Sequence, residues 1–292
     1  MTKNELLKMA EDPRFIEGIY NYCDRWCERC PLTSRCLTYA MEQSLGGGTT
    51  PQDVNSDAFW KQIESAFQLA QELIIDLAKE QGLDLSELDG PTETAENPRR
   101  AGNQWGVSTR EPQTSDFPDP GQDRQADAIR LARHYGQMVN DWFDSHDSLF
   151  QKKEVDLNCG QEIGLAKASL QSEFDSITDA VAVVRWYQHQ IFVKLRRASR
   201  RADFDLEDKQ ENEELAGLLQ DQSNGSAKVA LIGIERSQGA WLKLRNSLAD
   251  DAGSILSMLV HLDRLLRKTE EAFPQARNFC RPGFDTGAGK YE

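Results

Sequence analysis

The strongest constraint on the fold is a stretch of helical periodicity between residues 174 and 198. Apolar side chains recur there at alternating steps of three and four, the spacing of a seam between packed helices. A helix of this kind gains most of its stability by burying its apolar stripe, so the pattern predicts an assembly of helices. The seam positions, of which only one is polar, are Phe174, Ile177, Val181, Val184, Gln188, Ile191, Leu195 and Ala198.

Similar patterns occur elsewhere in the chain, and no stretch has a convincing β-strand pattern. Long helices are expected over residues 57–81, 122–146, 161–202 and 224–272, the last with a break near Asp250 and Asp251. Together they predict an all-α fold, an antiparallel helical bundle with a small N-terminal four-cysteine helical module. The seam expected over 57–81 consists of Phe59, Ile63, Ala66, Ala70, Leu73 and Leu77.

The helix expected over residues 224–272 has one face made of unusually small residues, which we call its small-sided face. Small side chains allow a neighbouring helix to approach closely, so we expect this face to be a helix–helix contact and not a ligand site. Its members are Ala227, Ala230, Gly233, Ser237 and Ala240.

The expected domain boundaries follow from changes in composition. Residues 1–48 form the four-cysteine module, 49–83 the first bundle helix, 122–273 the remaining bundle helices and 274–292 a C-terminal tail. Between residues 84 and 121 the helical pattern gives way to Pro, Gly, Ser, Thr and Asp. That composition predicts a linker or a long surface excursion.

The charge and hydropathy of the chain limit its partners. Its 292 residues include 34 Lys and Arg against 48 Asp and Glu, a net charge of −14, which disfavours nucleic acid. No apolar run approaches the roughly 20 residues that span a bilayer, and the first residues lack a secretory signal. We therefore expect a cytoplasmic protein without a membrane partner. A protein partner and the oligomeric state are left open.

Four of the six cysteines lie within fourteen residues, with the spacing C-x3-C-x2-C-x5-C: Cys23, Cys27, Cys30 and Cys36. In a reducing cytosol such a group is more typical of metal ligands than of disulfides. Four thiolates suit either a [4Fe-4S] cluster or a tetrahedral Zn²⁺ ion. The sequence therefore predicts a metal centre, iron–sulfur or zinc, in the N-terminal module.

Helix geometry constrains how these cysteines can converge. A helix is expected to lead into the group, and on a continuous helix Cys23 and Cys30 would be separated by about 10.5 Å of axial rise. Pro31 offers a solution, because the residue before a proline is pushed out of the α region. We expect Cys23 and Cys27 in the last helical turns, Cys30 at the broken end, and Cys36 at the start of the next helix. An iron–sulfur cluster tolerates wider sulfur spacing than one zinc ion, which favours iron–sulfur.

Three segments carry a resemblance to known sequences. Residues 15–36, FIEGIYNYCDRWCERCPLTSRC, resemble the opening of a group of uncharacterised bacterial helical proteins with a YCDRWCERC-type four-cysteine segment. Residues 225–234, GSAKVALIGI, and residues 279–284, FCRPGF, resemble the same group. The resemblance implies a bacterial, cytoplasmic protein, and it implies no particular activity.

The leading hypothesis is a metal-binding protein that acts as a redox- or metal-responsive sensor or adaptor. An alternative is an enzyme with an internal site near Gln188 and His189 and a purely structural metal; whether the protein is an enzyme stays open. A second alternative is nucleic-acid binding through a basic cluster. The acidic residues 203–221 follow this cluster, which favours a solvated, neutralised helix face instead. The basic cluster comprises Lys194, Arg196, Arg197, Arg200 and Arg201.

Overall fold

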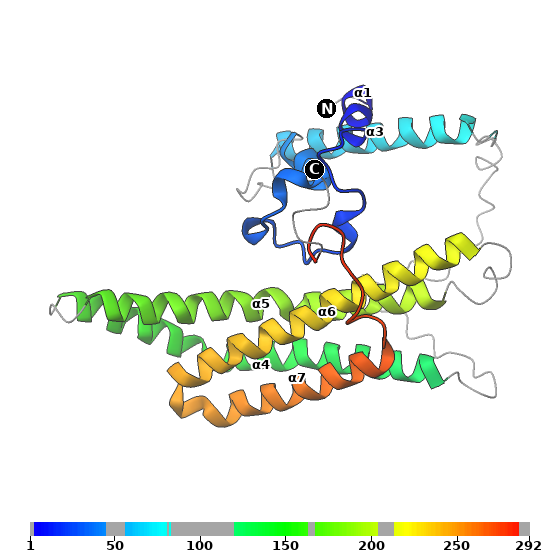
Figure 1. The fold of residues 1–292 in the computed structure, drawn as a ribbon. Coiled ribbons are helices and arrows are strands. Elements are labelled where there is room, and N and C mark those ends of the chain that lie inside the picture. The colour runs from blue at the N-terminus through cyan, green and yellow to red at the C-terminus, as the bar shows by residue number, and fades with distance from the viewer. Residues whose placement is uncertain are drawn as a thin grey trace, which may run out of the picture. The chain divides into compact units, whose positions relative to one another are not determined.

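A computed structural model describes residues 3–44, 56–80, 82, 120–162, 167–203 and 213–285 (Figure 1). Within these ranges every regular element is a helix, so the predicted all-α class is confirmed. The chain divides into two compact units. Unit 1 comprises Met1–Glu17 and Pro31–Ser115, and unit 2 comprises Gly18–Cys30 and Asp116–Glu292.

Unit 1 contains α1 (Lys3–Ala10), α2 (Leu37–Ser44) and α3 (Asp57–Glu80). The helix α3 matches the helix expected over residues 57–81, and Lys3 of α1 forms an ion pair with Asp76 of α3. The expected seam of α3 is only partly borne out, because Phe59, Ile63, Ala66 and Leu73 are half-buried whereas Ala70 and Leu77 are exposed. Several large apolar side chains of α3, Leu77 among them, are therefore exposed. The exposed set is Trp60, Phe67, Ile74 and Leu77.

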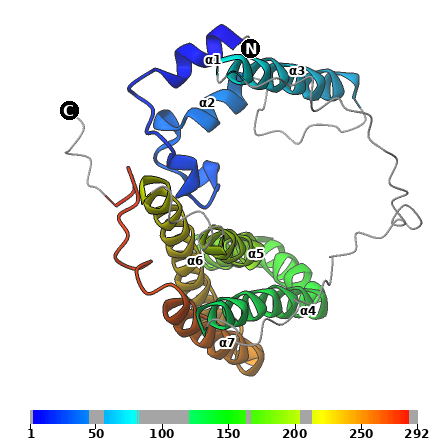
Figure 2. The ribbon, with the colours of Figure 1, turned by 90° about the vertical axis from the view of Figure 1, so that its right-hand side faces the viewer.

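Unit 2 contains four long helices: α4 (Pro120–Glu162), α5 (Lys167–Asp203), α6 (Glu213–Ser247) and α7 (Ala252–Ala272). Each helix contacts the next in the chain, and α7 also contacts α4 (Figure 2). Successive helices run in opposite directions (Figure 1). The four helices therefore close a bundle around one core.

The break expected near Asp250 and Asp251 reverses the chain. The helix α6 ends at Ser247, the short helix η5 (Ala249–Asp251) makes the turn, and α7 returns along α6. The segment expected to be helical over 224–272 with a break is thus two antiparallel helices. As a result, unit 2 has four bundle helices without α3. The sequence predicts α3 as the first bundle helix, but α3 belongs to unit 1.

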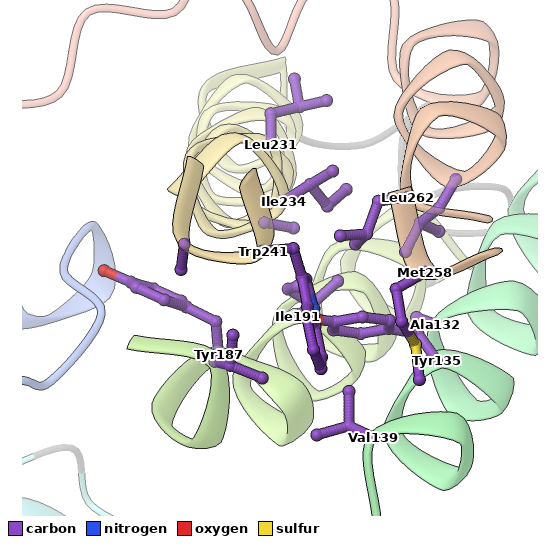
Figure 3. Close-up of a cluster of buried hydrophobic side chains, with 14 of the residues drawn as sticks. Ala132, Tyr135, Val139, Tyr187, Ile191, Leu231, Ile234, Trp241, Met258 and Leu262 are labelled. Atoms are coloured by element: carbon purple, nitrogen blue, oxygen red, sulfur yellow. The ribbon is translucent and has the colours of Figure 1, made fainter. Parts of the chain in front are cut away.

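The core of unit 2 confirms the seam predicted for α5. Ile177, Val184, Ile191, Leu195 and Ala198 are buried, and the polar seam residue is buried with them. Aromatic side chains from α4 and α6 fill the centre (Figure 3). There the indole Nε1 of Trp241 donates a hydrogen bond of 3.0 Å to the Tyr135 hydroxyl.

The small-sided face of α6 packs closely against α5, as predicted. A Cβ atom added at Gly233 would lie 2.8 Å from Cδ1 of Tyr187 and 3.2 Å from Cγ1 of Ile191. Figure 3 shows these two side chains of α5 directed toward α6. The other small residues of this face, Ala227, Ala230, Ser237 and Ala240, are buried.

The remaining expectations concern connecting segments. The linker expected over 84–121 lies outside the described residues, except for its last two, which begin α4. The acidic stretch 203–221 becomes helical at Glu213, where α6 begins. Beyond α7 the chain forms turns held against α6, where Lys228 donates to the Phe279 carbonyl and pairs with Asp285 at 3.0 Å. None of the described helices is both long and apolar enough to cross a bilayer.

Candidate functional site

The backbone around the cysteines differs from the predicted helix. Residues 11–36 form turns and three short 3₁₀ helices, η1 (Ile19–Asn21), η2 (Cys27–Arg29) and η3 (Thr33–Arg35). The expectation that two cysteines occupy the last turns of an α-helix is therefore wrong. Gly18 and Arg25 have φ values of 65° and 58°, a left-handed conformation that a right-handed helix does not accommodate.

Two details of the expected backbone are present, although the α-helix that was expected to end at Cys30 is not. Cys30 has an extended backbone with φ −87° and ψ 122° directly before Pro31, and α2 begins directly after Cys36. Because no α-helix joins Cys23 to Cys30, the axial rise of a helix does not fix the distance between their thiols.

The four cysteines are distributed over both units. Cys23, Cys27 and Cys30 belong to unit 2 and Cys36 to unit 1, and all four are half-buried. The Cys23 thiol lies 3.5 Å from the carbonyl oxygen of Tyr20. Among the described residues, no three His, Cys, Asp or Glu side chains are grouped so as to hold a metal ion. The metal centre stays a prediction from the spacing.

The three cysteines of unit 2 lie in a segment, Gly18–Cys30, that packs on α5 and α6; we call it the cysteine strap. Two hydrogen bonds from α5 hold its backbone: Lys194 Nζ donates to the Cys23 carbonyl at 2.6 Å, and Trp186 Nε1 to the Asp24 carbonyl at 3.2 Å. The Asp24 carboxylate also accepts hydrogen bonds from Tyr187 and, at 3.0 Å, from Arg236 of α6.

Aromatic and ionic contacts extend this attachment. The rings of Trp26 and Trp186 stack with centroids 5.0 Å apart and an interplanar angle of 18°. The guanidinium of Arg29 lies 4.0 Å from the Trp26 ring centroid and pairs with Asp179 of α5 at 2.6 Å. The side chains between the cysteines therefore attach the strap to the bundle.

The start of the strap contacts α6 and the C-terminal turns. The rings of Tyr22 and Phe279 are 5.3 Å apart, and Tyr22 occupies the space that a side chain at Gly225 would need. Arg197 of α5 donates a hydrogen bond to Asn21. Residues of all three segments singled out by resemblance thus meet within unit 2.

Burial shapes the electrostatics of this contact. Lys194 is only 4% exposed, and burial lowers the pKa of its ammonium to about 8, although the neighbouring Cys23 opposes the shift. Burial also raises the pKa of Tyr187 well above its ordinary value; Asp24 acts in the same direction and Arg236 opposes it. A buried cation therefore lies beside the first cysteine of the motif.

The basic cluster does not form the solvated face expected from the sequence. Lys194 is buried under the strap, and Arg197 is bonded to it. The guanidinium of Arg196 lies 5.9 Å from the ring centroid of Phe192. Arg200 is exposed, and the side chain of Arg201 is outside the described residues. The strap supplies hydrogen-bond acceptors to Lys194 and Arg197.

Gln188 and His189 differ in exposure. Gln188 is 7% exposed, whereas His189 is exposed. The Oε1 atom of Gln188 is buried without a hydrogen-bond partner in the described part of the chain. A Cβ at Gly136 of α4 would lie 3.2 Å from the Gln188 carbonyl oxygen, so this part of α5 packs tightly on α4. The arrangement favours helix packing over an internal catalytic site.

Relationships to known proteins were sought with protein-family models, curated proteins and solved structures. None of the three comparisons finds a match for this chain. Its own residues are therefore the basis on which a function is inferred.

Proposed function

We propose that this protein binds a [4Fe-4S] cluster, or alternatively a Zn²⁺ ion, through Cys23, Cys27, Cys30 and Cys36. In this proposal it acts in the bacterial cytoplasm as a redox- or metal-responsive sensor or adaptor. The observation that carries the proposal is the spacing C-x3-C-x2-C-x5-C, four thiols within fourteen residues. Thiolates at short, irregular spacing are the donor set of both kinds of centre.

The backbone of this region supports the proposal. Turns and 3₁₀ helices separate the four cysteines, and Cys30 is extended before Pro31. Such a chain can redirect each thiol by small changes in φ and ψ, whereas an α-helix holds successive side chains at fixed rise and rotation. Closing four thiols around one centre therefore does not require a regular helix to unfold.

The charges around the strap also support the proposal. Four thiolates on one divalent ion carry a net charge of about −2, which nearby cations offset. Lys194 and Arg236 contact the strap at Cys23 and Asp24, and Arg29 lies within it. Because Lys194 is buried, its interaction with a thiolate is screened less than it would be at the surface.

Metal analysis of anaerobically purified protein tests this function. We expect either iron and sulfide in equal amounts with a broad visible absorption shoulder, or stoichiometric zinc in a colourless sample. Cys27→Ser is expected to lose the metal, whereas Cys280→Ser is the matched control and should retain it, because Cys280 is an exposed thiol outside the motif. Wild-type protein that holds no metal after purification and anaerobic reconstitution would refute the proposal.

A further inference from the structure

The helix α3 carries an apolar stripe that is largely exposed. Trp60, Phe67 and Ile74 recur at steps of seven residues, and each is followed three residues later by another apolar side chain. The four largest exposed members, Trp60, Phe67, Ile74 and Leu77, are between 56% and 72% exposed. We call the whole set the outer stripe: Trp60, Ile63, Phe67, Ala70, Ile74 and Leu77.

The spacing of the outer stripe is that of a contact between two paired helices. Its steps of three and four continue without interruption along an unbroken helix of 24 residues (Figure 1). A strict seven-residue repeat keeps such a seam directed at one partner helix over its whole length. Contiguous apolar patches larger than a few hundred Å² are rare on monomers and mark interaction surfaces. The outer stripe is therefore expected to have a helical partner.

The described part of unit 1 does not supply this partner. Among the described elements α1 contacts α3 most, and its Lys3 pairs with Asp76, which lies outside the outer stripe. The large members of the stripe remain exposed beside this contact. A helix gains most of its stability from packing its apolar side chains, so α3 has a further contact to make.

The outer stripe is complementary to itself when a second copy is turned end for end. Every member would then meet another member, so a two-fold contact would use the same residues on both copies. The central layers would bring the large Phe67 against the small Ala70. On the flank, Glu64 would lie near Gln71 and not near another acid. The pairs that meet in this arrangement are Trp60 with Leu77, Ile63 with Ile74, and Phe67 with Ala70.

A parallel pair fits the same side chains less well. Phe67 would then meet Phe67 and Ala70 would meet Ala70, so a crowded layer would lie beside a hollow one. Both overpacking and cavities cost stability in a buried contact. The macrodipoles of two helices also favour the antiparallel arrangement, because opposite partial charges then lie side by side at each end.

The exposed area is sufficient for such a contact. An aromatic side chain has about 150–250 Å² of surface, so the exposed parts of the four largest exposed members come to on the order of 500 Å² per copy. Two copies would bury about 1,000 Å² from these side chains, and flanking residues bring the total near the roughly 1,200 Å² of the smallest stable interfaces. We propose that α3 joins two copies of this chain as an antiparallel helix pair through the outer stripe. This contact is independent of the metal.

Sedimentation equilibrium of the full-length protein under reducing conditions tests the contact. We expect a dimer for the wild type at micromolar concentration. Trp60→Glu should weaken the dimer by more than about tenfold, because the substitution acts at both ends of a two-fold contact. Gln68→Glu is the matched control: it adds the same charge at an exposed position of α3 outside the stripe and should leave the dimer nearly unchanged.

A charge pair tests the antiparallel register. Leu77→Lys alone should also weaken the dimer, but combined with Trp60→Glu in one chain it should restore dimerisation, because the new carboxylate of one copy then meets the new ammonium of the other. In a parallel pair the same double variant would bring like charges together at both ends and stay dissociated. Misfolding cannot explain the expected pattern, because a second substitution would not restore the dimer of an unfolded chain.

Three results would overturn the proposal. A wild-type chain that remains monomeric up to its highest soluble concentration does not use the stripe for self-association, whether another part of the chain or a different protein covers it. A dimer that is equally stable in Trp60→Glu is formed through another surface. A double variant that dimerises no better than either single variant excludes the antiparallel register.

Discussion

The close approach of α5 and α6 at Gly233 makes a quantitative prediction for Gly233→Ala. The added Cβ would lie 2.8 Å from Cδ1 of Tyr187 and 3.2 Å from Cγ1 of Ile191. Both partners are 1% exposed, so neither can move its side chain into solvent. Overpacking of a buried contact costs about 1–3 kcal/mol, and replacing a helical glycine with alanine returns about 1 kcal/mol. We expect a net loss of roughly 1 kcal/mol in the free energy of unfolding.

Gly239→Ala is the matched control, because nothing lies within 4 Å of a Cβ at that position of the same helix. It gains only the helix propensity of alanine and should stabilise the protein by about 0.5–1 kcal/mol. The two variants should then differ by about 2 kcal/mol, or roughly 4–8 °C in Tm for a unit of this size. Thermal and urea unfolding followed by far-ultraviolet circular dichroism measures both. Equal stability of the two variants would refute the close helix contact.

Two further predictions concern buried polar groups of the bundle. Gln188→Leu removes a buried amide oxygen that has no hydrogen-bond partner in the described part of the chain, so it should raise the free energy of unfolding by about 1 kcal/mol; a lower urea midpoint would contradict this. Burial lowers the pKa of His261, His134 and Arg264 act in the same direction, and the hydrogen bond to the Leu131 carbonyl opposes them. The unfolded chain therefore binds this proton first, and stability should fall as pH decreases below about 6.5 until the folded pKa is passed. His261→Gln should flatten that decrease in urea titrations between pH 7 and 5, and an unchanged slope would exclude His261 as its source.

The helical bundle was predictable because long apolar seams are compatible with few arrangements other than packed helices. The buried positions of α5 follow the seam from Ile177 to Ala198, and the small-sided face of α6 makes the expected close contact. The reversal between α6 and α7 was not predictable from the same pattern. Asp250 and Asp251 indicate a helix break, but a kink and a complete turn leave similar local signals in the sequence. Only the contact of α7 with both α4 and α6 distinguishes them.

The error before the cysteine cluster has a different cause. Phe15, Ile16, Ile19 and Tyr20 recur at helical spacing, yet the backbone there forms turns followed by the short 3₁₀ helix η1 and no α-helix. Gly18 lies among them in a left-handed conformation, which a right-handed helix does not accommodate. Ile19 is nevertheless buried, so the pattern identified a buried side chain but not the secondary structure that presents it.

The attachment of the strap could not be derived from local sequence, because Asp24 and Arg236 are 212 residues apart. The basic residues of α5 were predicted to be neutralised by the acidic stretch that follows them. In the structure, Lys194 and Arg197 donate hydrogen bonds to a carbonyl and an amide oxygen of the strap. A polyanion that used these two cations would first have to displace the cysteine strap. Nucleic-acid binding at this cluster therefore competes with a contact that the chain itself provides, and the net charge of −14 disfavours it further.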